Sequence, residues 1–231
     1  LPICSGSLGH DAAVSGTGSR GRASLAQAPA AQARRGGRRP DGTAVSGYNR
    51  RPLAPASDPS PMQDLAPTAR PITLDVEASG FGRGSYPIEI GFAFPDGSTA
   101  AWLIRPAPDW THWDAEAEAV HGISRETLLA EGRSVVEVAA LLNGQLAGNR
   151  VYSDAWSFDA SWVARLYDAA GFSQHFRIDT VRALLTEDEV ACWPRARDLV
   201  QREHGAPVHR AATDAHLLQL TVLRARALAR S

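Results

Sequence analysis

The stretch Leu74-Asp75-Val76-Glu77-Ala78-Ser79-Gly80 places two carboxylates directly behind an apolar run. The lead-in, Pro71-Ile72-Thr73-Leu74, is apolar and β-branched with proline only at its first position, which predicts a buried strand ending near Val76. Residues two apart share one face of a strand, so Asp75 and Glu77 leave it on the same side. Such neighbours repel unless a cation lies between them, and Mg²⁺ or Mn²⁺ prefers oxygen ligands. Alone, the pattern fits an ordinary strand end equally well.

The composition of the whole chain argues against a protein with a transmembrane helix, a zinc protein and a disulfide-stabilised protein. There is no apolar run near eighteen residues, which argues against a transmembrane helix. The two cysteines, Cys4 and Cys192, form no Cys-x-x-Cys pair. This argues against a zinc site or a disulfide scaffold and fits a reducing cytosol, so we expect a cytoplasmic protein.

Charge is distributed unevenly along the chain. Residues 1–66 carry eight arginines against four acids, a net charge of +4, whereas residues 67–231 carry sixteen arginines against twenty-one acids, a net charge of −5. An acidic domain is not suited to holding long duplex DNA by general attraction to phosphates. If it handles nucleic acid, we expect short or single-stranded ends bound through metal ions and a local cleft.

Residues 1–66 form a segment of Gly, Ser, Pro, Ala and Arg with almost no hydrophobic periodicity. Such a segment buries too little apolar surface to offset its ordering entropy, which predicts a disordered tail before a globular domain at 67–231. Met62 is the only methionine, and it lies just before the first strand. We interpret Met62 as the natural start and residues 1–61 as translated upstream sequence or an artefact of expression; an RNA-binding arm is the alternative.

From residue 70 onward, the pattern predicts an α/β domain. Three strands in a meander, ending near Val76 and spanning Ile88–Phe94 and Thr99–Arg105, should be antiparallel neighbours, with Asp96-Gly97 as a hairpin turn. Two shorter strands are expected at Arg150–Ser153 and Phe176–Ile178. Helices are expected at Trp113–Val120, after caps at Ser124 and Ser134, and at Phe158–Ala170, Thr180–Leu185, Trp193–His204 and Arg210–Leu228.

Three more candidate residues follow the opening pair. Asp159 lies at a strand-to-helix transition, where a helix cap is the simpler interpretation. His209 and Asp214 lie in His-Arg-Ala-Ala-Thr-Asp, at the entry to the last helix. Considered separately, His209 could be a surface turn residue and Asp214 a solvated helix carboxylate.

Three motifs occur here in order: Asp-x-Glu on the first strand, Phe-Asp at the start of a middle helix, and His-x-Ala-x-x-Asp at the start of the last helix. With this order, residues 70–228 resemble the DnaQ-like (DEDDh) 3′–5′ exonuclease family. Glu89-Ile90-Gly91 and His121-Gly122-Ile123 are also typical of that family. The resemblance implies the ribonuclease H-like fold, a mixed five-stranded sheet with three antiparallel strands and then two shorter ones, flanked by helices.

The resemblance also implies a mechanism. Asp75, Glu77, Asp159 and Asp214 would hold two divalent ions, Mg²⁺ or Mn²⁺, about 3.5–4 Å apart at a phosphodiester. His209 would be the general base on the attacking water, a task that suits imidazole at neutral pH. The product would be a 5′-mononucleotide released from the 3′ end.

The loop behind the first motif would bind the terminal nucleotide. The resemblance assigns this to the backbone of Ser79 and Gly80, with Phe81 as a base-stacking wedge and His121 near the terminal base or sugar. For Phe81 and His121, loop packing and turn capping are equally good interpretations.

The middle motif departs from the family pattern His-Asn-x-x-Phe-Asp. Asp154 stands at the histidine position and Ala155 at the asparagine position. All five catalytic positions are filled, so the departure bears on substrate preference. We interpret Asp154 as a solvated or capping residue and not as a fifth metal ligand.

The leading hypothesis is therefore a 3′–5′ exonuclease whose partners are single-stranded 3′ ends or short oligonucleotides, of DNA or RNA. The alternatives are an inactive nucleic-acid-binding module and a phosphodiesterase for small dinucleotides. Association as a homodimer or with a polymerase is suggested by analogy to the family alone.

Overall fold

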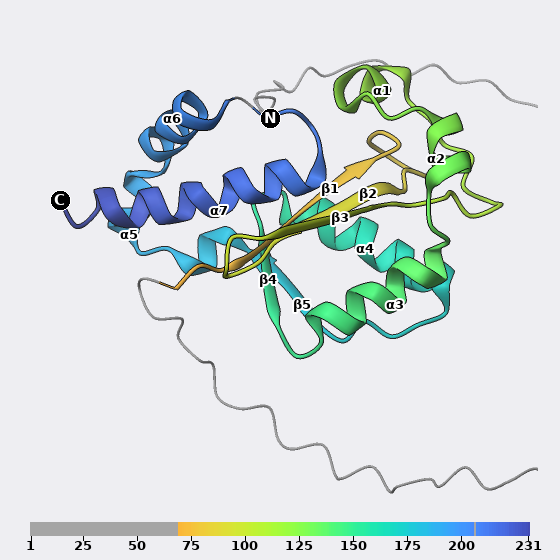
Figure 1. Cartoon of the computed structure of the whole chain (residues 1–231), viewed down its shortest axis with the longest axis horizontal. Helices are drawn as coiled ribbons and strands as arrows, with labels where there is room; N and C mark the ends of the chain where they lie inside the picture. Colours follow the sequence, from red (N-terminus) through yellow and green to blue (C-terminus); the bar gives the residue numbers. More distant parts are fainter. Residues whose placement is uncertain (1–68, 206) are drawn as a thin grey trace, which may run out of the picture. The chain divides into compact units, whose positions relative to one another are not determined.

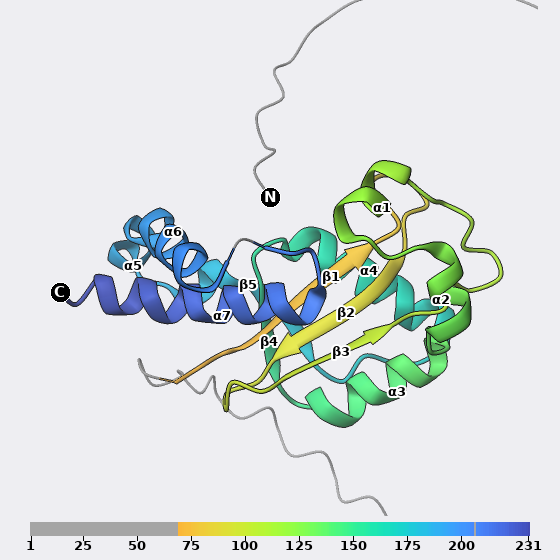
Figure 2. The same cartoon turned by 45° about the horizontal axis from the view of Figure 1, so that its top comes forward.

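The computed structural model describes residues 69–205 and 207–231. The expectations for residues 1–66, including a start at Met62, lie outside the described residues. Five strands form one sheet in the order β3-β2-β1-β4-β5, with helices on both of its faces (Figures 1 and 2). Their bounds are β1 Ile72–Ala78, β2 Pro87–Ala93, β3 Thr99–Leu103, β4 Arg150–Ser153 and β5 Arg177–Thr180.

The strand pairing confirms the predicted mixed sheet. β1 pairs with β2 and β2 with β3 in antiparallel register, whereas β4 runs parallel to β1 and β5 parallel to β4. β1 is longer than predicted, because its pairing with β2 continues through Glu77↔Glu89 and Ala78↔Pro87. Glu77, just beyond the predicted end, therefore belongs to the strand as Asp75 does.

The helices fall close to their predicted positions. They are α1 Ala115–His121, α2 Arg125–Glu131, α3 Val135–Leu146, α4 Trp156–Ala170, α5 Glu187–Ala191, α6 Trp193–His204 and α7 Ala211–Leu228, with a 3₁₀ turn, η1, at Val181–Leu184. Ser124 and Ser134 cap α2 and α3 as predicted. The helix predicted over 180–185 forms as the short 3₁₀ helix η1, and α5 was not predicted.

The two faces of β1 carry different chemistry. Leu74 and Val76 face the main core, which α3 and α4 close with Val138, Leu142, Val163 and Leu166. Thr73 lies on the opposite face, where its Oγ1 donates to the carbonyl oxygen of Ala215 in α7 at 2.7 Å. By alternation, Asp75 and Glu77 share that face, so α7 is the helix that approaches the two carboxylates.

Buried side chains fix α7 to the sheet. The Nε2 of Gln219 donates to the carbonyl oxygens of Pro71 and Phe94, both at 2.8 Å. Helix α7 is thereby tied to β1 on one side and to the end of β2 on the other. Within residues 69–205 and 207–231, no helix is both long enough and apolar enough to cross a membrane.

Candidate active site

The first pair of carboxylates lies where two parallel strands separate. β1 and β4 are paired only at Ile72↔Val151 and Thr73↔Tyr152. Beyond those pairs β1 continues towards Asp75 and Glu77, bonded only to the antiparallel β2. In open α/β sheets, ligands bind outside the carboxyl ends of strands at such a change of direction.

Asp159 comes to this point from the first turn of α4. Its side chain is only 1% exposed, and one oxygen accepts a hydrogen bond from the hydroxyl of Ser153 at the end of β4. The pKa of Asp159 is raised to about 8, mainly by burial; the hydrogen bond from Ser153 lowers it, and the negative charges of Asp154 and Glu77 contribute to the rise. Asp159 is therefore buried and does not cap α4, whose N-cap residue is Ala155; its role as a site residue stays a prediction.

Asp75 lies close to Asp159. Burial raises the pKa of Asp75 well above its usual range, and the charges of Asp159 and Glu77 add to that effect. Burial and neighbouring negative charges both disfavour the ionised form of this acid, which a bound cation would favour.

His209 and Asp214 come to the same place at the start of α7. The two Asp214 oxygens accept hydrogen bonds from the backbone N–H groups of Val208, at 3.2 Å, and His209, at 3.1 Å. His209 has a φ of 53°, and it is the only non-glycine residue with positive φ in the described part of the chain. The carboxylate of Asp214 thus holds the backbone that carries the imidazole.

Glu77, His209 and Asp214 form a group that can hold a metal ion. Each offers one ligand atom, and these atoms all lie within 4.8 Å of one another. The pKa of Glu77 is raised to about 7, mainly by burial and also by the charges of Asp214 and Glu89, while the charge of Arg210 lowers it. Burial also raises the pKa of Asp214.

These properties fit a divalent cation. Burial and mutual repulsion disfavour the ionised forms of these crowded carboxylates. A hard divalent cation bound between them would stabilise the ionised forms. Asp154 is exposed, yet it lies close enough to add to the raised pKa of Asp75, Asp159 and Asp214, behind the larger effect of burial. The fifth acid therefore belongs to the electrostatics of the site.

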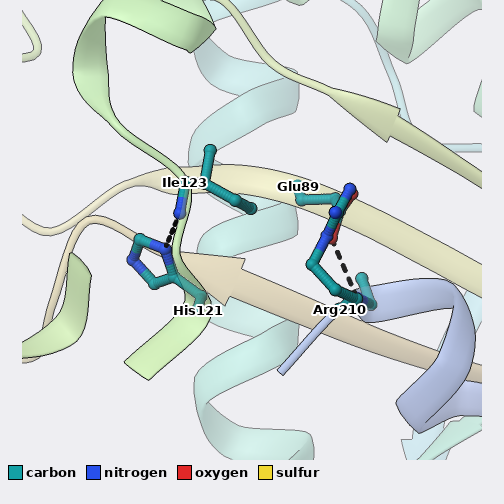
Figure 3. Close-up of polar contacts among 5 residues, drawn as sticks. Glu89, His121, Ile123 and Arg210 are labelled. Carbon is teal, nitrogen blue, oxygen red and sulfur yellow. Dashed lines mark hydrogen bonds and ion pairs between the residues drawn. The ribbon is translucent and has the colours of Figure 1, made fainter. Parts of the chain in front are cut away.

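An ion pair that the sequence did not predict fixes the start of α7. Glu89 on β2 is 3% exposed and accepts hydrogen bonds from the Nε of Arg210, at 3.0 and 3.2 Å, and from its second guanidinium nitrogen at 2.6 Å. The backbone N–H of Ala211 donates to the same carboxylate at 3.0 Å. Figure 3 shows this pair between β2 and α7. Because Arg210 follows His209 directly, the pair positions the predicted base.

Gly91 allows that contact. A Cβ on Gly91 would lie 2.3 Å from the backbone nitrogen of Ala212 and 2.4 Å from the carbonyl carbon of Ala211. The first turn of α7 therefore rests directly on the backbone of β2. This gives Glu89-Ile90-Gly91 a physical role: the glutamate caps the helix and the glycine makes room for it.

Ser79 and Gly80 are built into the loop behind β1. Ser79 is 1% exposed, its N–H donates to the carbonyl oxygen of Tyr86, and its carbonyl oxygen accepts from the N–H of Asp114. Gly80 has a φ of 132°, and a Cβ there would lie 2.5 Å from that of Asp114. His112, which the sequence did not single out, lies 3.1 Å by its Nδ1 from the Ser79 hydroxyl. The predicted contacts of Ser79 and Gly80 with a nucleotide stay predictions.

Phe81 lies in an aromatic cluster beside the acids. It is 55% exposed and meets Phe158 edge-on, with ring centroids 5.4 Å apart. Trp162 completes the cluster at 5.9 Å from Phe81 and 5.8 Å from Phe158. Phe158 is also exposed and precedes Asp159 in the chain. Phe81 is thus both packed against α4 and exposed, and its stacking on a base stays a prediction.

His121 ends α1 and caps the turn that follows (Figure 3). Its Nδ1 accepts a hydrogen bond from the backbone N–H of Ile123 at 3.0 Å. Burial lowers its pKa, against the charges of Glu118 and Glu89, so the ring is neutral at physiological pH. Its Nε2 is buried and has no partner within the described residues. The turn-capping role is present, and a contact with the terminal nucleotide stays a prediction.

Comparison with known proteins identifies the fold. No protein-family model matches the sequence, and no curated protein matches it either. Solved structures do match. A zinc-bound complex of Escherichia coli exonuclease I with single-stranded DNA aligns at a TM-score of 0.52 and 15% identity, covering 66% of this chain and 39% of that one. Exonuclease I from Methylocaldum szegediense aligns at 0.52 and 16%, covering 67% and 39%. The E. coli enzyme with a dT13 oligonucleotide aligns at 0.51 and 14%, covering 68% and 40%.

At these identities the likeness shows the fold alone, which is ribonuclease H-like. The chain spans about two fifths of the length of each neighbour. The predicted fold class is confirmed. The roles predicted for the site residues stay predictions.

Proposed function

We propose that this chain is a metal-dependent 3′–5′ exonuclease of the DnaQ-like (DEDDh) kind that releases 5′-mononucleotides from single-stranded nucleic acid. One observation carries the proposal: acids from β1, α4 and α7 and the imidazole of His209 converge at the carboxyl end of β1. Glu77, His209 and Asp214 meet within 4.8 Å, and the charges of Asp159 and Asp214 raise the pKa of Asp75 after the larger effect of burial.

Asp75, Glu77, Asp159 and Asp214 would hold Mg²⁺ or Mn²⁺, two ions per site. When bound, such ions make a bound water more acidic and stabilise negative charge on the oxygens of an in-line phosphodiester displacement. Their positive charge would also lower the raised pKa of Glu77 and Asp159, keeping the four carboxylates ionised.

The remaining work falls to side chains of the chain itself. His209 accepts the proton of the attacking water on a ring nitrogen, as general base. Asp214 and the Glu89–Arg210 pair hold its backbone from two sides. Phe81 and Phe158 present ring faces and edges on which the terminal base stacks.

The structural neighbours support single-stranded DNA as the first substrate to test, because several of them are complexes with single-stranded oligonucleotides. RNA uses the same phosphodiester chemistry and stays a second substrate. Association with a polymerase or as a homodimer is a further expectation from the family.

The experiment incubates the full chain with 5′-labelled single-stranded DNA, the matching RNA and a dinucleotide, each with Mg²⁺ or with EDTA. Asp75→Ala is the inactive variant, and Asp198→Ala, an exposed acid on α6, is the matched control. We expect a ladder of one-nucleotide steps that disappears with EDTA and with Asp75→Ala but not with Asp198→Ala.

Two other results would contradict the proposal. Tight binding of the oligonucleotides without cleavage under either metal would identify an inactive binding module. Rapid hydrolysis of the dinucleotide alone would identify a small phosphodiesterase.

A further inference from the structure

A groove lies between the glycine-rich loop after β1 and helix α4. It has a volume of about 460 Å³, within the range of ligand-binding clefts. The loop contributes Arg83 and Ser85 to its wall, and α4 contributes Ser161, Trp162, Arg165 and Asp168. None of these residues has a role in the proposed chemistry.

The groove is continuous with the aromatic cluster. Trp162 belongs to both, because it packs against Phe81 and Phe158 and also lines the groove. Its indole N–H donates to the hydroxyl of Ser85 at 3.0 Å, which joins α4 to the loop. A strand whose terminal base stacks on Phe81 and Phe158 would therefore reach the groove next.

Helix α4 links the groove to the acids. Asp159, Trp162 and Arg165 are spaced three residues apart, so they follow one another along one side of the helix. Arg165 lies about 9 Å along the helix axis from Asp159. An anion held there would be a neighbour of the group held at Asp159.

Two arginines in the groove have no anionic partner. Within the described residues, neither Arg83 nor Arg165 forms an ion pair or donates a side-chain hydrogen bond, and Arg165 lies 5.5 Å over the ring of Trp110. Asp168 is the one acid in the wall. The charged side chains of the groove wall therefore sum to a net positive charge, whereas the domain as a whole is net acidic. Phosphate groups would bind more favourably in the groove than elsewhere on the domain.

We propose that this groove binds the phosphates of the nucleotides on the 5′ side of the terminal one, with Arg83 and Arg165 as the phosphate contacts. This inference depends on the proposed nuclease function for its substrate. The site is short. Beyond Arg165, the adjoining hollow is lined by Asp109 and Asp168 with no cation besides Arg165, so phosphates farther along the strand gain nothing there.

The test compares the full wild-type chain with Arg83→Gln, Arg165→Gln and the double variant. Arg197→Gln, an exposed arginine on α6 outside the groove, is the matched control. Hydrolysis of a thymidine dinucleotide and a thymidine pentanucleotide is measured with Mg²⁺. Binding of a fluorescein-labelled pentanucleotide is measured with Ca²⁺ over a series of salt concentrations.

We expect each groove variant to raise KM for the pentanucleotide roughly tenfold, with kcat unchanged and the dinucleotide hydrolysed as by the wild type. The slope of log affinity against log salt should fall by about 0.7 for each arginine removed. A variant that merely disturbed the fold would not change that slope selectively.

The outcomes separate this inference from the proposed function. If the wild type hydrolyses the pentanucleotide and the groove variants have the same KM and salt slope as the wild type, the groove proposal is wrong and the nuclease proposal stands. If the groove variants weaken binding but the wild type hydrolyses neither substrate, the groove proposal is supported and the nuclease proposal is wrong. Groove variants that also lose turnover of the dinucleotide would overturn the groove as a separate subsite.

Discussion

His209 is the residue with two competing chemical roles. It lies within reach of the ligand atoms of Glu77 and Asp214, so it could bind a metal ion, whereas the proposed mechanism makes it a general base. We expect His209→Ala to lower kcat by about 10² to 10⁴-fold, the usual contribution of general acid–base catalysis. Metal affinity, measured by calorimetric titration with Mn²⁺, should stay close to that of the wild type. A loss of Mn²⁺ binding instead would make His209 a ligand.

Asp154 carries a negative charge near the site but is not one of the predicted metal ligands, so its charge can be removed while all four ligands remain. Burial is the main cause of the raised pKa of Asp75 and Asp159, and Asp154 adds to it. Removing that negative charge lowers both pKa values, so the acids ionise at lower pH. Asp154→Asn should therefore shift the acidic limb of the kcat profile to lower pH by roughly half a unit, measured at saturating Mg²⁺.

Asp198→Asn on α6 is the control for this shift, since Asp198 is exposed and is not among the charges that raise the pKa of the site acids. A shift to higher pH, or complete loss of activity, would mean that Asp154 binds the metal directly.

At this scale, the sequence motifs predicted that Asp75, Glu77, Asp159, His209 and Asp214 would come together, and the structure brings them to one place; their catalytic roles stay predictions. Glu89 and Arg210 were not predictable as a pair, since 121 residues separate them and burial of a single glutamate leaves no local signal. His112 and Asp114 were missed for the same reason: their contacts with Ser79 and Gly80 exist only in the folded chain.

At the scale of the element, the contact between α7 and β2 is the part of the fold that the site depends on most directly. Gly91→Ala places a methyl group 2.3 Å from a backbone nitrogen of α7, and backbone cannot move aside as a flexible side chain can. We expect this variant to lower the free energy of unfolding by about 1–3 kcal/mol and to reduce kcat, because the start of α7 carries His209. Urea unfolding and the rate on an oligonucleotide check both effects.

Gly144→Ala is the matched control for that substitution. Gly144 lies on an exposed turn of α3, and a Cβ there meets no atom within 4 Å. Alanine should stabilise this helix by about 0.5–1 kcal/mol and leave kcat unchanged. Equal effects of the two substitutions would mean that the approach of α7 to β2 is not close in solution.

Element boundaries were predictable where the chain carries its own capping signals. Ser124 and Ser134 marked helix starts correctly. The capping box of Thr186 and Glu189 is the signal that could have found α5. β1 continues two residues past its predicted end near Val76, because Glu77 and Ala78 still pair with β2, and the sequence carries no local signal for that pairing.

At the scale of the whole molecule, the buried acids make the stability of the metal-free protein depend on pH. The folded-state pKa values of Glu77, about 7, and Asp159, about 8, exceed the ordinary carboxylate values near 4. The folded state therefore binds more protons than the unfolded state in that window, so the free energy of unfolding falls as pH rises from about 4 to about 8. We expect a loss of a few kcal/mol across it.

Thermal unfolding with EDTA at pH 5 and pH 8 measures this loss, and Mg²⁺ should raise Tm more at pH 8 than at pH 5. Asp159→Asn removes one of the shifted groups and should flatten the dependence. A metal-free protein whose Tm increases from pH 5 to pH 8 would show that the acids are not held together in solution.

The left-handed backbone of His209 narrows which amino acids can occupy that position. Left-handed φ values disfavour most side chains but are several-fold enriched in histidine, asparagine and aspartate. Among these, only histidine titrates near neutral pH. Glutamate, lysine or tyrosine could transfer a proton but would have to distort the turn that Asp214 holds. The local conformation and the proposed chemistry thus favour the same amino acid, and His209→Asn is the substitution that would remove the proposed base while keeping the turn.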